Sequence, residues 1–159
     1  MDVNVRDVEE IVRFGHSLKG FLSDYLSMLG RVGSAAQQDY TTARNNLQRI
    51  RGNAESAERD LRQAERQLDS AYRTANNNPE EDHSDRIDYL ERLVEEKQER
   101  YERNKEALAE AEQLTKRVKV NTDMVWEQTN RSRNQINELG HTALSSIQKA
   151  ANAIKNYIR

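Results

Sequence analysis

The sequence predicts an all-α protein: a long antiparallel helical hairpin or coiled coil, forming a single elongated helical domain over residues 1–159. Composition is the first observation, because only 35% of residues are hydrophobic, 33% are charged and the mean hydropathy is −1.04. This balance suits helices that bury one narrow stripe. The chain also contains a single Pro. Finally, apolar residues recur at alternating spacings of three and four on both sides of that Pro, which is the spacing of helical heptads.

The first arm, residues 5–75, carries the stronger heptad pattern. Its predicted seam, the row of residues that faces the other helix, runs through Val5, Val8, Val12, Gly15, Lys19, Leu22, Leu26, Leu29, Gly33, Ala36, Tyr40, Ala43, Leu47, Ile50, Ala54, Ala57, Leu61, Ala64, Leu68, Ala71 and Ala75. A strict seven-residue repeat of this length predicts a left-handed coiled coil. The many seam alanines beyond Tyr40 predict a close approach of the two helices.

A turn is predicted at residues 76–84, near the midpoint of the chain. Three Asn precede Pro79. Asn tolerates left-handed backbone angles, and Pro cannot continue a helix. Ser84 or Asp85 is the expected cap of the helix that follows.

The second arm, residues 85–158, has a weaker register. Its predicted seam includes Ile87, Leu90, Val94, Tyr101, Leu108, Ala111, Val118, Val125, Ile136, Leu139, Ala143, Ala150, Ala153 and Tyr157, and the polar residues Lys97, Asn104, Thr115, Thr122, Thr129, Ser132 and Ser146. The central turn folds the arms antiparallel, so that the numbers of facing residues sum to about 160. Trp126, the single Trp, is therefore expected beside Gly33 and Ser34.

The glycines leave a second architecture open. Each Gly inside a helix costs roughly 1 kcal/mol relative to Ala. Breaks at Gly30–Gly33 and at Gly140 would give a four-helix bundle, with helices near 5–31, 34–75, 85–139 and 142–158.

A second apolar stripe near the termini is the candidate partner-binding surface. It consists of Ile11, Phe14, Leu18, Phe21, Tyr25, Met28 and Val32 in the first arm and Leu144, Ile147, Ala151, Ile154 and Ile158 in the second. A two-helix hairpin buries one stripe per helix, so these residues need another partner. Two occupants remain open: the chain itself, as a homodimer or by folding at Gly30–Gly33, or another helical protein.

The sequence offers little for catalysis or for ligands. There is no Cys and the net charge is −2, which gives no general attraction for nucleic acid. Glu138-Leu139-Gly140-His141 has the Glu-x-x-His spacing of di-iron bundles, but such a site needs two of these motifs. We expect no enzyme activity, cofactor, metal or membrane span. The acidic start is not that of a secretory signal peptide, so we expect a cytoplasmic protein, with signal-peptide-independent export as an alternative.

The stretch from Val8 through Phe14 and Leu18 to Leu26 resembles the first helix of the small Trp-x-Gly proteins of type VII secretion systems and of their longer toxin-escorting relatives. This chain has Asn-Asn-Asn-Pro in place of the Trp-x-Gly turn, and it lacks the C-terminal Tyr-x-x-x-Asp/Glu signal after Tyr157. The resemblance implies a dimeric, non-enzymatic adaptor or chaperone that docks another helical protein, such as a secreted toxin or effector. The alternative function is a structural coiled-coil spacer or homo-oligomeric assembly protein.

Overall fold

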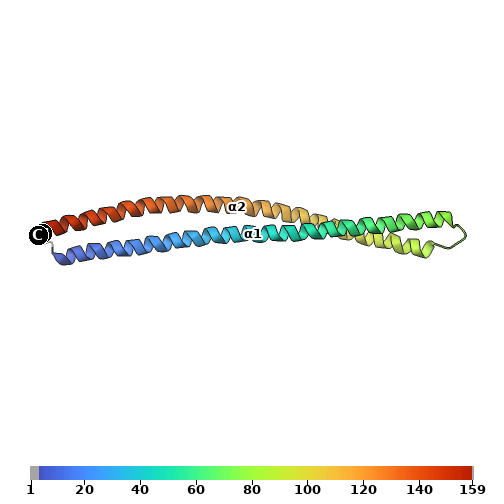
Figure 1. The fold of residues 1–159 in the computed structure, drawn as a ribbon, viewed down its shortest axis with the longest axis horizontal. Coiled ribbons are helices and arrows are strands. Elements are labelled where there is room, and N and C mark those ends of the chain that lie inside the picture. The colour runs from blue at the N-terminus through green and yellow to red at the C-terminus, as the bar shows by residue number, and fades with distance from the viewer. Residues whose placement is uncertain (1–3, 159) are drawn as a thin grey trace. The chain divides into compact units, whose positions relative to one another are not determined.

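A computed structural model describes residues 4–158 and consists of two long helices. Helix α1 spans Val5–Asn77 (73 residues) and helix α2 spans Ser84–Ile158 (75 residues). Figure 1 shows the two helices packed antiparallel and joined by the turn, and no strand occurs between residues 4 and 158. The predicted all-α helical hairpin is confirmed.

Each helix begins with a side-chain cap. At the start of α1, Asn4 Oδ1 accepts a hydrogen bond from the Arg6 N–H at 2.8 Å, and Asp7 Oδ2 accepts one from the Asn4 N–H at 2.8 Å. This reciprocal pair is a capping box. At the start of α2, Asp82 Oδ1 accepts from the Ser84 N–H at 3.0 Å and from the Ser84 hydroxyl at 2.6 Å. The acceptor that caps α2 is therefore Asp82, two residues before the predicted Ser84.

The turn lies where the sequence predicts it, although α1 continues two residues further, to Asn77. The Glu81 N–H donates to the Asn78 carbonyl at 3.2 Å, which places Pro79 at the second position of a four-residue turn. Pro favours that position because its ring presets the backbone angle φ. None of the described non-Gly residues has a positive φ, so the left-handed angles expected of the asparagines are not used.

Both helices run without a break through their glycines. Gly30 and Gly33 lie inside α1, and Gly140 lies inside α2. The four-helix alternative with breaks at these positions is therefore wrong. Tertiary packing outweighs the low helix propensity of Gly here, as it commonly does in long helices.

Contacts within the chain fall into two compact units. The terminal unit contains α1 up to Asp39 and α2 from Val120, and the turn unit spans Tyr40–Lys119. The single elongated domain stays a prediction.

The turn unit follows the predicted seam and has a core of small residues. Its buried apolar residues are Ala54, Ala57, Leu61, Ala64, Ala71, Leu90 and Ala111. Exposed ion pairs cross between the helices, from Arg100 to Asp60 at 3.1 Å and from Arg51 to Glu112 at 3.5 Å. These surface pairs contribute little stability. Their residue numbers sum to about 160, so the predicted antiparallel pairing is confirmed.

Candidate docking surface

In the terminal unit, α1 does not use the whole of its predicted seam. Ile11 and Leu18 are half-buried, whereas Val12 and Lys19, which the sequence assigns to the seam, are exposed. The observed seam of α1 consists of Val8, Ile11, Gly15, Leu18, Leu22, Leu29, Gly33 and Ala36, with Tyr25 and Leu26 half-buried at its edges.

Helix α2 departs from its predicted seam at the same level. Beyond Ile136 the seam of α2 runs through Gly140, Leu144, Ile147, Ala151 and Ile154, and Ala143 and Ser145 are half-buried beside it. Leu139, Ala150, Ala153 and Tyr157, which the sequence assigns to the seam, are exposed instead. Part of the predicted second stripe of each arm is therefore packed inside the hairpin.

A local change of register accounts for both departures. Along α1 the seam steps by four residues twice in succession, from Tyr25 to Leu29 and on to Gly33, where a strict heptad would alternate three and four. On α2 the step from Ile136 to Gly140 and on to Leu144 does the same. Such a stutter unwinds a left-handed supercoil locally and moves the seam to a neighbouring stripe.

Three glycines let the helices approach at this new seam. A Cβ atom at Gly140 would lie 2.7 Å from Leu22 Cδ1, and one at Gly15 would lie 3.2 Å from Ile147 Cγ2. Gly33 leaves room for the ring of Trp126 in the same way, because a Cβ at Gly33 would lie 3.1 Å from Trp126 Cζ3. The predicted pairing of Trp126 with Gly33 is confirmed.

The hydroxyls of the buried threonines on α2 donate hydrogen bonds to backbone carbonyls. In the terminal unit, Thr122 Oγ1 donates across the seam to the Ala36 carbonyl at 3.0 Å, and Thr129 Oγ1 donates to the Trp126 carbonyl at 3.0 Å. In the turn unit, Thr115 Oγ1 donates to the Ala111 carbonyl at 2.7 Å. These three polar seam positions therefore cost little stability, since each hydroxyl has a backbone acceptor.

The predicted partner-binding residues divide into two groups. Ile11, Leu18, Tyr25, Leu144, Ile147 and Ile154 are half-buried, and most of them belong to the observed seam. Phe14, Phe21, Met28, Val32 and Ile158 are exposed. The residues that stay accessible lie mainly on α1.

One set of accessible apolar residues lies on one side of the seam. Phe14, Phe21 and Met28 each precede a seam residue of α1 by one position. Leu139, Ala143, Ala150 and Ala153 precede seam residues of α2 in the same way, and Tyr157 lies one heptad after Ala150. In an antiparallel pair, positions with this offset on the two helices meet on the same side. We name these eight residues, with Val32, the apolar flank.

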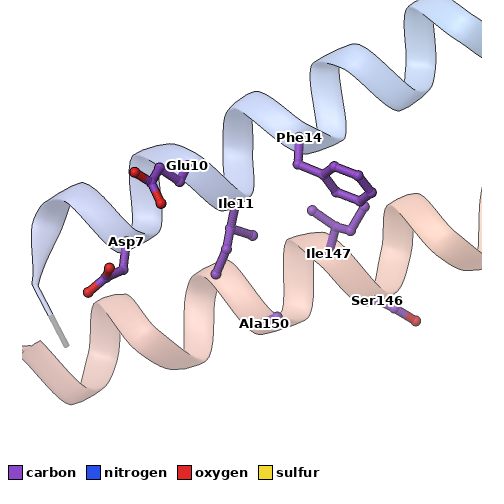
Figure 2. A pocket seen from close by; sticks show the side chains of 7 residues that line it. All are labelled: Asp7, Glu10, Ile11, Phe14, Ser146, Ile147 and Ala150. Atoms are coloured by element: carbon purple, nitrogen blue, oxygen red, sulfur yellow. The ribbon is translucent and has the colours of Figure 1, made fainter. Parts of the chain in front are cut away.

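Figure 2 shows the end of the apolar flank nearest the termini, where α1 and α2 form a groove. Phe14 lies beside Ile147, and Ile11 points toward α2 near Ala150. A second groove on the opposite side of the seam is lined by Lys19, Ser23, Leu22, Leu26, Leu144, Ile136, Asn137, Gly140 and His141, and both grooves mix polar and apolar residues.

Side-chain size also differs across the apolar flank. The α1 half carries Phe14, Phe21 and Met28, whereas the α2 half carries Ala143, Ala150 and Ala153 between the larger Leu139 and Tyr157. Sequence reasoning missed the α2 half because it assigned these alanines, Leu139 and Tyr157 to the seam. Their spacing of three and four was visible in the sequence, but it did not reveal which of two apolar stripes faces α1.

The carboxylates beside the groove already have local partners. Asp7 belongs to the capping box, and Glu10 pairs with Arg6 at 3.5 Å. Within the part of the chain that the structure describes, no group of three or more His, Cys, Asp or Glu side chains is arranged to hold a metal ion. The chemistry that this surface offers is apolar contact.

Comparison with known proteins adds no relative: no family model matches the chain, and no curated protein or solved structure does so. Neither of the two described helices contains a stretch apolar enough to cross a membrane.

Proposed function

We propose that the protein is a non-enzymatic helical adaptor that docks another helical protein through the apolar flank of its terminal unit. The observation that carries this proposal is the exposure of large apolar side chains along the apolar flank. Phe14 and Phe21 leave 62% and 66% of their surface exposed, and Leu139 and Tyr157 leave 69% and 78% exposed.

The size of this surface supports docking. Taking about 150–250 Å² for a large apolar or aromatic side chain, these four residues together with Met28 and Val32 expose on the order of 700 Å². Apolar patches beyond a few hundred Å² are unusual on proteins that function alone. Aromatic side chains at the centre of such a patch are the usual anchors of protein–protein binding.

The geometry of the groove favours a helical partner. Two antiparallel helices leave a groove along their length, and an amphipathic helix can place its apolar face there. The proposal agrees with what the resemblance to toxin-escorting Trp-x-Gly relatives implies. A structural spacer or homo-oligomeric assembly protein is the second candidate, favoured by the small side chains of Ser146 and Ala150 at the level of Phe14.

Site-specific photo-cross-linking in cells of the source organism tests this function. We would place the photoreactive analogue benzoylphenylalanine at Phe21 in one variant and at Tyr89, an exposed aromatic of the turn unit, in a matched control. The proposal expects a cross-link from position 21 to a different, helical protein and none to that protein from position 89. Equal cross-linking from both positions, or none from position 21, would contradict it.

A further inference from the structure

We infer that, when the chain is alone, the apolar flank is covered by a second copy of the same chain, related by a twofold axis parallel to the helices. This inference rests on the proposed docking role of the flank and names its occupant. It follows from the area of the flank and from the small side chains of Ser146 and Ala150 at the level of Phe14.

A twofold axis in this direction places α1 of one copy over α2 of the other. The rotation does not change a residue's position along the helix axis, so facing residues of the two copies lie at the same height. Phe14, Ser146 and Ala150 line one groove and so lie at one level. In the pair, Phe14 of each copy therefore stands over the small side chains of Ser146 and Ala150 of the other copy.

One heptad further along the match is partial. Because the numbers of facing residues sum to about 160, Phe21 lies level with Leu139 and Ala143. Phe21 therefore meets one large and one small side chain of the other copy. A twofold axis perpendicular to the helices would instead place α1 over α1, setting the large residues against one another and leaving the alanines without contacts.

Area and topology agree with this pairing. Each copy offers on the order of 700 Å² of exposed apolar surface, close to the roughly 800 Å² per partner of a stable complex. The four helices of the two terminal units would form a bundle in which every neighbouring pair is antiparallel, the arrangement of up-down four-helix bundles. A twofold interface of this kind is self-complementary.

The absence of Cys from the chain makes disulfide mapping a direct test. Ser17 and Ser146 are both exposed, border the flank, and lie at about the same level on α1 and α2. We would prepare Ser17→Cys and Ser146→Cys as separate proteins carrying tags of different mass, mix them, allow exchange of copies and oxidise. Neither protein alone contains a second Cys, so every disulfide joins two chains.

The inference expects the mixed disulfide to exceed both self-linked products several-fold. Ser23→Cys mixed with Asn137→Cys, two exposed residues that line the groove on the opposite side of the seam, should give a several-fold lower yield. Predominant Ser17→Cys self-linking would overturn the arrangement, because it requires α1 over α1. No cross-linking above that control pair would overturn the pairing itself.

Solution mass provides the second measurement. Light scattering should give twice the chain mass, and Phe14→Glu with Phe21→Glu should raise the dimer dissociation constant at least a hundredfold. Helix content should hardly change, since both side chains are exposed, and Tyr89→Glu should leave the dimer intact. A monomeric wild-type chain would overturn this inference, and the adaptor function would stand if position 21 still cross-links to a different protein.

Discussion

A substitution at Gly33 tests how much the stability of the terminal unit depends on glycine in the seam. A Cβ atom there would lie 3.1 and 3.2 Å from two carbons of the Trp126 ring, well inside the 3.5–4.0 Å at which carbon atoms pack. Leu at this position would force the ring off the seam. Gly20 lies on the same helix, and a Cβ there would meet nothing within 4 Å, so Gly20→Leu is a matched control for Gly33→Leu.

The expected magnitudes follow from burial. Trp126 is 50% exposed, so at about 250 Å² for a whole indole side chain it covers roughly 125 Å², worth about 3 kcal/mol at 25 cal/mol per Å². Leu gains about 1 kcal/mol of helix propensity over Gly. We therefore expect Gly33→Leu to lower the free energy of unfolding by about 2 kcal/mol and Gly20→Leu to raise it by about 1 kcal/mol.

Urea unfolding followed by circular dichroism measures both changes. Trp fluorescence adds a local signal, since Trp126 is the only Trp and its emission should shift to longer wavelength in Gly33→Leu alone. Equal stability of the two variants, with unchanged emission in both, would refute the idea that Gly33 is required by close contact with the ring.

Three further predictions concern other parts of the hairpin. Gly52→Ala, where a Cβ would meet nothing within 4 Å, should raise the free energy of unfolding by about 1 kcal/mol and the melting temperature by about 2–4 °C in a circular dichroism melt. Thr122→Val, which removes the donor to the Ala36 carbonyl, should lower the free energy of unfolding by about 1 kcal/mol, whereas Thr122→Ser should largely retain it in urea unfolding. Hydrogen bonds from the Ser84 hydroxyl and then its N–H lower the pKa of Asp82. Its charged form is thus favoured in the folded state, and the stability advantage of wild type over Asp82→Ala should be constant above about pH 5 and disappear as the pH falls through that lowered pKa. An advantage that grows in acid would contradict this sign.

Most of the fold could be predicted from the sequence because local signals agree with one another. Pro79 and the preceding asparagines mark the turn, and the heptad spacing marks both helices. The pairing that follows from a central turn brought Trp126 to Gly33, as the structure confirms.

The seam of the terminal unit could not be predicted, because both helices carry two apolar stripes there. Val12 and Ile11 are adjacent and similar in hydrophobicity, so spacing alone does not choose between them. The choice depends on tertiary contacts of Gly15 and Gly140 with large side chains of the opposite helix. The observed docking surface differs from the predicted one for the same reason. Leu18 and Ile147, predicted to bind a partner, belong to the seam, whereas Leu139 and Ala150, predicted for the seam, are exposed.

The glycine contacts also determine which alignment of the two helices is adopted. A heptad repeat looks alike after a slide of seven residues, so seam residues alone leave several alignments close in energy. Sliding α2 by one heptad in one direction would set Leu22 against Ile147, two large side chains where one glycine now makes room. Sliding it in the other direction would set Gly15 against Gly140 and leave a void, which is costly in a packed interior. Residues that weaken each helix by itself therefore specify a single alignment of the pair.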